Sequence, residues 1–492
     1  MAKLAKGLFV YPYRIDPWVQ FGKVPPIGLE IVAASVKDLF NSIDIIDMRF
    51  EDDLMNYLEG TDVVCLSMPW GREKGVAGGI SKGYDIEYIY KLIQKIPDNK
   101  TLVIGGTFAS ESADYLMNNF PNIDIVVNGQ GEETLREFLT SGSTHNVNGI
   151  FHRNNGKVIR SKERKPNIIP FLYPDRQLRK YKYYLFGNQI DCMYTSHGCP
   201  HRCVYCEFEG SKWNNRSADD MFQEIKSMDK DVKFILINDN NFFENTQRAE
   251  KFIDLLNEHK IRKTFWAQAR SQPLAKRKDL VAKLNTAGFI LAIGVESPQD
   301  HVLKWLKKGY MRSINDEAFE NMKKTSIVIQ AYYIIGNYKE TRDEILSITD
   351  YSHDNWIDFI CLNRLRCYPQ SKLAGMIDKL DGIYVDKTDL RVYTDEVKKK
   401  ELTKLTKIIN NKFYLSRTIW RTLCKLSFLM NVPVVFRYFI CSLINLYVFK
   451  RNRKMIRFTD AVFRFNIFLP FDLLLNYFLR FLGRLVYGIK PR

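Results

Sequence analysis

The stretch SHGCPHRCVYCEFEG, residues 196–210, holds three cysteines on one short segment: Cys199, Cys203 and Cys206. It continues the apolar run IDCMYTS, so the cysteines are predicted to lie in a loop at the carboxyl end of a strand. Thiolates ligate iron–sulfur clusters, and four cysteines are the usual set. Three thiolates leave one iron of a four-iron cluster open, much as a catalytic zinc site keeps one position open. The pattern therefore indicates a cluster whose fourth ligand is a substrate.

Two other interpretations of these cysteines stay open at this point. A structural zinc ion needs a fourth ligand close by, for which His197 and His201 are available. Alternatively, the three cysteines are unrelated. The chain has nine cysteines in all, an odd and scattered set unlike a disulfide framework, and the apolar run at its N-terminus is too short for a signal peptide. We therefore expect a reducing cytoplasm, where thiols are free to bind metal.

The cysteine loop resembles the signature of the radical SAM superfamily, Cys-x3-Cys-x-aromatic-Cys, with Tyr205 at the aromatic position. In that family the open iron binds the amino and carboxylate groups of S-adenosylmethionine. An electron from the cluster then cleaves a carbon–sulfur bond and yields the 5′-deoxyadenosyl radical. The resemblance implies a [4Fe–4S] cluster on the three cysteines, S-adenosylmethionine as a cofactor, and an electron donor such as flavodoxin or ferredoxin.

Three further cofactor-binding residues follow from the same resemblance, which extends from Gln189 to Pro369. Asp239 and Arg270 come at the ends of later strands, and Glu296 matches the acid expected near the cofactor ribose. Each also has a structural interpretation: Asp239 as a helix N-cap or loop acid, Arg270 as a salt-bridge partner, and Glu296 as an ordinary acid. In the segment YYIIGNYKETRDEI the usual Gly-x-Pro-x-Glu-Thr form is replaced by one with Asn337-Tyr338-Lys339, so no role is assigned to that loop.

The second part of the chain is predicted to be a partial (β/α)6 barrel of the TIM type, in which sites sit at the carboxyl ends of the strands. Helical stretches such as DLVAKLNTAG and ETRDEILSITDYS separate its apolar runs. The six predicted strands are IDCMYTS (190–196), KFILIND (233–239), KTFWAQAR (263–270), FILAIGVES (289–297), SIVIQAYYIIG (326–336) and FICLNRLRC (359–367).

The first 150 residues alternate strand and helix and predict a doubly wound, Rossmann-like α/β domain. Its apolar runs are continuous, as in parallel strands that are covered on both faces. The predicted strands are GLFVYPY (7–13), IDII (43–46), TDVVCLSM (61–68), TLVIGG (101–106) and DIVVNG (124–129), and the helix after the first of them is IGLEIVAASVKDLF (27–40). Ligands bind beyond the carboxyl ends of such strands.

Three loops at those ends look suited to a ligand. Glycines let the backbone approach a ligand closely, and a helix N-terminus offers free N–H groups, although glycine at a strand end is also ordinary turn chemistry. Together with PPIGLEIVAASVKD, these loops resemble the cobalamin-binding domain of cobalamin-dependent radical SAM enzymes. The cofactor-binding candidates are Ser67, Gly105, Gly106, Thr107, Gly129, Gly131 and Glu132.

One motif of some cobalamin domains is missing. Those domains carry Asp-x-His-x-x-Gly, whose histidine ligates cobalt, whereas this chain reads IIDMRFEDD, with Asp47 and Arg49 but no histidine. Cobalt would then be bound without a histidine from this motif, which suits methyl transfer. A domain that has lost cobalamin is the alternative.

The charge of +17 is confined to the C-terminal region. Residues 398–492 contain 20 of the 73 Lys and Arg but only three of the 56 acidic residues. Here aromatic and leucine-rich stretches (426–436, 438–449 and 463–490) flank the basic cluster KRNRK, and no charge-free run reaches the ~20 residues of a spanning helix. We expect helices lying in a membrane interface; a helical cap on the barrel and a spanning helix are the alternatives. Nucleic acid is disfavoured because the region is so apolar.

The predicted organisation is a cobalamin-binding-like domain (1–150), a linker or hairpin (151–188), the radical SAM barrel (189–370) and a helical, basic, membrane-associated region (371–492). The resemblance implies an enzyme that methylates an unactivated carbon, and the tail suggests a lipid-like substrate at the cytoplasmic face of a membrane. A radical rearrangement, cyclisation or oxidation enzyme, with or without cobalamin, is the alternative. A non-catalytic iron–sulfur or corrinoid-binding protein is a further one.

Overall fold

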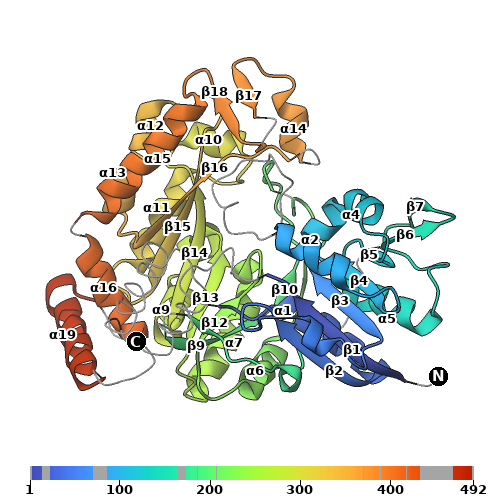
Figure 1. The fold of residues 1–492 in the computed structure, drawn as a ribbon. Helices are drawn as coiled ribbons and strands as arrows, with labels where there is room; N and C mark the ends of the chain where they lie inside the picture. The colour runs from blue at the N-terminus through green and yellow to red at the C-terminus, as the bar shows by residue number, and fades with distance from the viewer. Residues whose placement is uncertain are drawn as a thin grey trace. The chain divides into compact units, whose positions relative to one another are not determined.

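The structure is a computed structural model that describes residues 3–13, 23–69, 86–164, 173–185, 187–206, 208–368, 371–386, 389–416, 418–430, 432 and 469–489. The chain divides into two compact units, Met1–Tyr183 and Tyr184–Arg492. Each unit is built around its own seven-stranded sheet and its own hydrophobic core (Figure 1).

The sheet of the first unit has the strand order β2-β1-β3-β4-β5-β6-β7. Strands β2 to β5 in this order pair in parallel, which is a doubly wound arrangement, and the hairpin β6–β7 extends the edge in antiparallel fashion. The predicted Rossmann-like fold is confirmed. The elements are β1 (Leu4–Tyr11), α1 (Ile27–Ser35), β2 (Phe40–Asp47), β3 (Val63–Ser67), α2 (Ile86–Lys95), β4 (Thr101–Gly105), α3 (Thr107–Glu111), α4 (Ala113–Asn119), β5 (Ile125–Val127), α5 (Gly131–Ser141), β6 (Ile150–Asn154) and β7 (Lys157–Arg160).

The sheet of the second unit has the order β16-β15-β14-β13-β12-β9-β8. The six strands from β9 to β16 are parallel, and β8 joins the edge in antiparallel fashion. They correspond to the six predicted strands, so the partial barrel is confirmed. The strands are β8 (Tyr184–Leu185), β9 (Asn188–Met193), β12 (Val232–Ile237), β13 (Thr264–Ala269), β14 (Phe289–Glu296), β15 (Val328–Ile335) and β16 (Phe359–Arg364).

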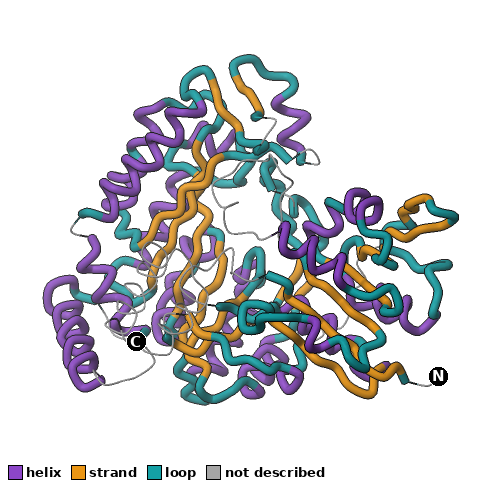
Figure 2. The backbone as a smooth tube through the Cα atoms, viewed as in Figure 1, coloured by secondary structure: helices purple, strands orange, loops and turns teal. Residues whose placement is uncertain are grey.

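Helices cover one face of this curved sheet, with the strands running side by side beneath them (Figure 2). Alternate strand residues such as Leu291, Ile293 and Tyr333 point into that core and are fully buried. The opposite strand face is therefore the inner face of the half-barrel. The helices of this unit up to the last strand are α6 (Ala218–Ser227), α7 (Thr246–Glu258), α8 (Ser271–Lys276), α9 (Lys278–Ala287), α10 (Asp300–Trp305), α11 (Arg312–Met322), α12 (Arg342–Leu346) and α13 (Ile348–Asp354).

The C-terminal region begins with α14 (Lys372–Ile377) and the hairpin β17 (Ile383–Val385) and β18 (Val392–Thr394), followed by helices. Helix α15 (Lys399–Tyr414) buries Leu402, Leu405, Ile409 and Phe413 in the barrel core. Helix α16 (Thr418–Leu429) docks at the amino end of the strands, because Lys425 forms a fully buried ion pair of 2.9 Å with Asp358, which directly precedes β16. These two helices match the cap interpretation of the tail.

The last described helix is α19 (Leu469–Tyr487), which packs on α16. None of the helices that the structure describes has both the length and the hydropathy needed to cross a bilayer. The apolar segment 438–449 and the basic cluster 450–454 of the sequence analysis lie outside the described residues.

Candidate active site

The cysteine loop follows β9 and is closed at its base by a small antiparallel pair, β10 (Ser196–His197) with β11 (Asn214–Asn215). Gly198 has φ +79°, and a Cβ on it would overlap the carbonyl of Lys212 across the loop, so glycine is required there. The Cys199 amide donates to the Ser211 hydroxyl at 2.8 Å. The loop that carries the three thiols is therefore held at both ends.

The donor set fits an iron–sulfur cluster. Cys203 is buried, whereas Cys199 and Cys206 are half-buried. Among the described residues, no three His, Cys, Asp or Glu side chains converge in the way that one metal ion would require. A [4Fe–4S] cluster makes no such demand, because each thiolate ligates a different iron.

Arg270, directly after β13, lies at the cysteine loop. Its Nη1 donates to the Cys203 sulfur at 3.4 Å, its Nη2 donates to the Lys308 carbonyl, and its guanidinium stacks over the Tyr310 ring at 5.0 Å. Arg270 therefore places a positive charge directly beside a sulfur of the cysteine loop. Arg270 Nε is buried without a hydrogen-bond partner among the described residues.

Glu296, at the end of β14, lies in a buried polar cluster with Lys308 and Tyr205. Lys308 Nζ donates to Glu296 Oε1 at 2.7 Å, and both side chains are more than nine-tenths buried. The Tyr205 hydroxyl also bonds this carboxylate, and its pKa is raised well above the usual value by burial and by the negative charge of Glu296. Glu296 has φ +64°, and the Ser297 amide closes a three-residue turn onto Val295. Such strain in a non-glycine residue is typical of functional sites.

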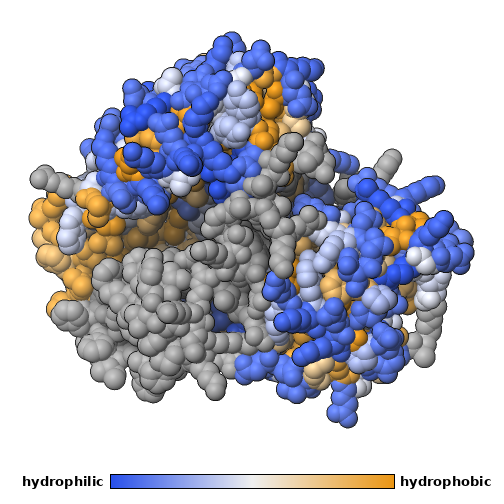
Figure 3. All heavy atoms as spheres, turned by 45° about the horizontal axis from the view of Figure 1, so that its top comes forward, coloured by the Kyte–Doolittle hydropathy of each residue, from blue (hydrophilic) through white to orange (hydrophobic). Residues whose placement is uncertain are grey.

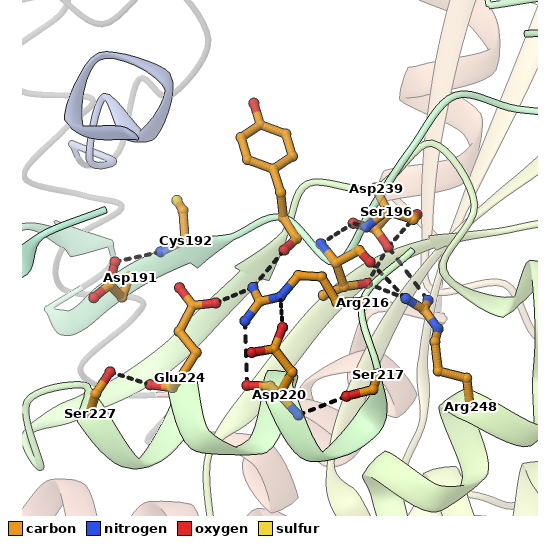
Figure 4. Close-up of polar contacts among 12 residues, drawn as sticks. Asp191, Cys192, Ser196, Arg216, Ser217, Asp220, Glu224, Ser227, Asp239 and Arg248 are labelled. Carbon is orange, nitrogen blue, oxygen red and sulfur yellow. Dashed lines mark hydrogen bonds and ion pairs between the residues drawn. The ribbon is translucent and has the colours of Figure 1, made fainter. Parts of the chain in front are cut away.

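Asp239, after β12, instead holds the end of β9 in place (Figure 4). Its carboxylate accepts from the amides of Thr195 and Ser196 at 2.7 and 2.9 Å and from both of their hydroxyls. Arg248 lies 3.7 Å away and donates to the Thr195 carbonyl at 2.8 Å. Asp239 therefore positions the segment that leads into the cysteine loop.

A second buried arginine supports the same segment. Arg216 donates to the Tyr194 carbonyl at 2.9 Å and pairs with Glu224 and Asp220 on α6 (Figure 4). The sequence analysis missed Arg216, Arg248 and Lys308. Nothing in their local sequence distinguishes them from surface residues, because their partners are brought close only by folding.

The loop after β15, where the sequence departs from the family form, is closed by its own glutamate. Glu340 Oε2 accepts from the amides of Gly336 and Asn337 at 2.9 and 3.1 Å and from the Asn337 side chain at 3.0 Å. Burial nevertheless raises the pKa of Glu340 to about 7. Asn337 thus fills the loop by hydrogen bonding to the glutamate.

This glutamate predicts a pH dependence of stability. Its pKa is higher in the folded state than its ordinary value of 4.5, so the folded state binds the proton more tightly between these values. Stability should fall as pH rises from about 4.5 to about 7 and then level off, by on the order of 3 kcal/mol at most. Glu340→Gln should flatten the melting temperature over that window, whereas exposed Glu320→Gln should leave the slope unchanged. An unaltered slope in Glu340→Gln would contradict this assignment.

In the first unit, the predicted ligand loops lie at one edge of the sheet. Ser67 and Gly105 are register partners on β3 and β4, and β5 is the next strand. Gly106 has φ +109°, and a Cβ there would come within 2.7 Å of the Met68 backbone, so the close approach of the two loops requires glycine. Thr107 then opens α3.

The loop after β5 adds an open backbone and a buried acid. Gly129 has φ +92° with no atom within 4 Å of where a Cβ would lie, and Gly131 opens α5. Glu132 Oε2 is buried without a hydrogen-bond partner among the described residues, and burial raises the pKa of this carboxyl. Open backbone and an unpaired carboxyl oxygen fit a polar ligand at this edge.

The position of the missing histidine is taken by a buried ion pair. Arg49 Nη2 lies 2.6 Å from Asp47 Oδ2, and both side chains are almost fully buried at the carboxyl end of β2. The Tyr183 hydroxyl donates to Asp47 at 3.1 Å. The first histidine of the chain is His145, far along the sequence from this position.

Comparison with known proteins agrees with both units. Residues 20–139 match the B12 binding domain family, and residues 193–351 match the radical SAM superfamily. In solved structures, the fold resembles the radical SAM methyltransferase TsrM of Kitasatospora setae (15% identity, 81% of this chain and 79% of that chain, TM-score 0.61). It also resembles the cobalamin-dependent radical enzyme OxsB (16% identity, 99% of this chain and 81% of that chain, TM-score 0.64).

Three curated relatives are 24–26% identical to this chain. An uncharacterized methyltransferase of Pyrococcus horikoshii is 26% identical, over 71% of this chain and 77% of its own length. An anaerobic magnesium-protoporphyrin IX monomethyl ester cyclase of Synechocystis is 24% identical, over 65% and 66%. A hopanoid C-3 methylase of Methylococcus capsulatus is 24% identical, over 66% and 63%. The two family matches show that the chain carries a B12 binding domain over residues 20–139 and a radical SAM domain over residues 193–351.

Proposed function

We propose that this enzyme is a cobalamin-dependent radical SAM methyltransferase that acts on an unactivated carbon of a hydrophobic, lipid-like substrate. The observation that carries the proposal is the juxtaposition of the three-cysteine loop with Arg270 at the Cys203 sulfur, in a chain that also has a B12-binding domain. When bound, a [4Fe–4S] cluster would supply the electron that cleaves S-adenosylmethionine, and cobalamin would supply the methyl group.

In the second unit, different residues would bind the iron–sulfur cluster and S-adenosylmethionine. Cys199, Cys203 and Cys206 would hold the cluster, and Arg270 keeps a positive charge beside it. Glu296 offers a carboxylate that Lys308 and Tyr205 hold in one orientation, which suits acceptance of hydrogen bonds from the ribose hydroxyls of S-adenosylmethionine. Asp239 acts one step away, by fixing the strand end that leads into the loop.

In the first unit, Ser67, the Gly105–Thr107 loop and the Gly129–Glu132 loop would contact cobalamin at the carboxyl edge of the sheet. Because Asp47 and Arg49 form an ion pair with each other, the cobalt would be held without a histidine from that strand end. The alternative of a domain that has lost cobalamin predicts protein without cobalt.

The inner face of the half-barrel supports a hydrophobic substrate. Side chains that alternate with those of the helical core include Ile290 and the half-buried Trp266 and Tyr332. Trp266 Nε1 donates to Gln330 Oε1 at 3.0 Å, which fixes one polar pair on this face. One relative, the hopanoid C-3 methylase, is named for a lipid substrate. We therefore also propose action at the cytoplasmic face of a membrane, with flavodoxin or ferredoxin as the electron donor.

A second candidate function is oxidative cyclisation or another radical reaction without methyl transfer. It is favoured by the similarity to the magnesium-protoporphyrin ester cyclase. The two functions differ in the products of S-adenosylmethionine. Both form 5′-deoxyadenosine, but only methyl transfer also forms S-adenosylhomocysteine.

The test is the cofactor content and product pattern of anaerobically purified protein from cobalamin-fed cells. About four irons and one cobalt per chain would support the methyltransferase. So would formation of both S-adenosylhomocysteine and 5′-deoxyadenosine when a reductant and a lipid extract are added. Iron without cobalt would remove cobalamin from the proposal, and cobalt with no S-adenosylhomocysteine would favour the second function.

A further inference from the structure

Helix α19 exposes an unusually apolar face. Single exposed apolar side chains are ordinary, but a contiguous set on one helix marks an interaction surface. Figure 3 shows such an apolar area at the left edge of the molecule. The exposed large apolar residues of this helix, each between 39% and 71% accessible, are Leu473, Leu474, Leu475, Tyr477, Phe478, Phe481, Leu485 and Val486. We call this set the α19 face.

The helix is oriented by two polar residues, Asn476 and Arg480, which point into the protein. Asn476 is buried; its amide nitrogen donates to the Ser427 carbonyl at 3.1 Å, and its oxygen accepts from the Val432 amide at 3.0 Å. Arg480 Nε donates to the same Ser427 carbonyl at 2.6 Å. Gly483 packs closely, since a Cβ there would lie 3.1 Å from the Cys424 Cβ on α16. A surface helix normally turns its apolar face to the core and its polar face to water. Helix α19 has the opposite arrangement.

The end of the barrel to which this helix is attached is also defined. Helix α16, against which α19 packs, is fastened at the amino ends of the strands through Lys425 with Asp358 and through the Thr264 hydroxyl, which donates to the Leu429 carbonyl at 3.0 Å. The cysteine loop follows β9 at the carboxyl ends. Within this unit, the α19 face and the cysteine loop therefore belong to opposite ends of the parallel strands.

Charge selects among possible occupants of the face. Residues 398–492 carry a net charge of +17, equal to that of the whole chain, and Asp472 is the only acid of α19. A second copy of the chain would bring like charges together. Arg484 is exposed on the same helix, and a long basic side chain at the margin of an apolar face can reach headgroup phosphates while its stem stays in the apolar layer.

We propose that the α19 face docks the enzyme on the surface of an anionic lipid bilayer, with its aromatic and leucine side chains in the interfacial region. Binding of this kind combines buried apolar area with attraction of basic residues to anionic lipid. The helix lies on the bilayer and holds the enzyme there, with the cysteine loop at the other end of the barrel. This inference deepens the membrane part of the proposed function but does not depend on methyl transfer.

The test is flotation of the full-length, cluster-loaded protein with vesicles of phosphatidylcholine, with and without phosphatidylserine. The wild type should float with anionic vesicles and less so in high salt. The variant Phe478→Glu/Phe481→Glu should lower the bound-to-free ratio by about tenfold or more, because two apolar side chains are lost from the interface. A matched control, Ile159→Glu/Met311→Glu, adds the same charge at exposed apolar positions elsewhere and should float like the wild type.

Several outcomes would overturn the proposal. Wild-type protein that stays with the soluble fraction, or a double variant that floats as well as the wild type, would exclude the α19 face as the docking surface. Equal binding to neutral vesicles would exclude the anionic component. A wild-type oligomer that becomes monomeric in the double variant would assign the face to self-association. Cleavage of S-adenosylmethionine, measured without vesicles on the same samples, separates failure of this inference from failure of the enzymatic proposal.

Discussion

Cys203→Ala is expected to abolish the iron–sulfur cluster and, with it, reductive cleavage of S-adenosylmethionine. Cys203 is the buried member of the three cysteines, and its sulfur is the one that Arg270 contacts, at 3.4 Å. Two remaining thiols cannot complete a set that already lacks a fourth cysteine. The rate of 5′-deoxyadenosine formation should fall by at least about 1,000-fold, which corresponds to about 4 kcal/mol in activation free energy.

Iron content and the visible absorbance of anaerobically purified protein give the direct measurement. Cys424→Ala is the matched control, because Cys424 is also buried in the second unit but lies on α16, at the amino ends of the strands. That control should keep its iron and its activity. A Cys203→Ala protein with about four irons per chain would show that the cluster is held elsewhere.

The second large effect is expected for Asp239→Ala. The carboxylate is 1% exposed, accepts four hydrogen bonds from Thr195 and Ser196, and lies 3.7 Å from Arg248. Its removal leaves the buried guanidinium of Arg248 without its charged partner, which costs about 3–5 kcal/mol. Because the same contacts fix the strand end before Cys199, the variant should also lose iron.

Scanning calorimetry and iron analysis of Asp239→Ala, beside the control variant Asp254→Ala, would check this prediction. Asp254→Ala removes an acid that pairs with Lys283 at 2.8 Å on the surface, with both side chains well exposed. That pair should contribute no more than about 1 kcal/mol, so the control should melt near the wild type. Asp239→Asn keeps an acceptor oxygen but not the charge, so its melting temperature and iron content should lie between those of Asp239→Ala and the wild type. If Asp239→Ala keeps both its melting temperature and its iron, the carboxylate has no positioning role.

Much of the fold could be predicted from local sequence. Continuous apolar runs such as FILAIGVES and TLVIGG are buried on both faces of a parallel sheet, and that requirement acts on each segment separately. The cysteine loop was predictable for the same reason, because the three thiols lie on one short segment. In the first unit, Gly106 and Gly129 both have positive φ at strand ends, where the sequence placed turns.

Other features depend on residues that are distant in sequence. The partner of Glu296 is Lys308, and Thr195 is held by Asp239 and Arg248, so no local pattern indicates these pairs. Folding decides them, since a buried charge is tolerated only where another element supplies its partner.

Helix α19 shows the same division most clearly. Its sequence established an apolar, basic helix but not which side faces the protein. The hydrogen bonds of Asn476 and Arg480 to the Ser427 carbonyl on α16 turn the polar side inward and leave Phe478 and Phe481 exposed. Composition determined by itself that the region would be apolar and basic. Only tertiary packing decided which surface is presented, because the direction of a helix face depends on the partners available to its polar groups.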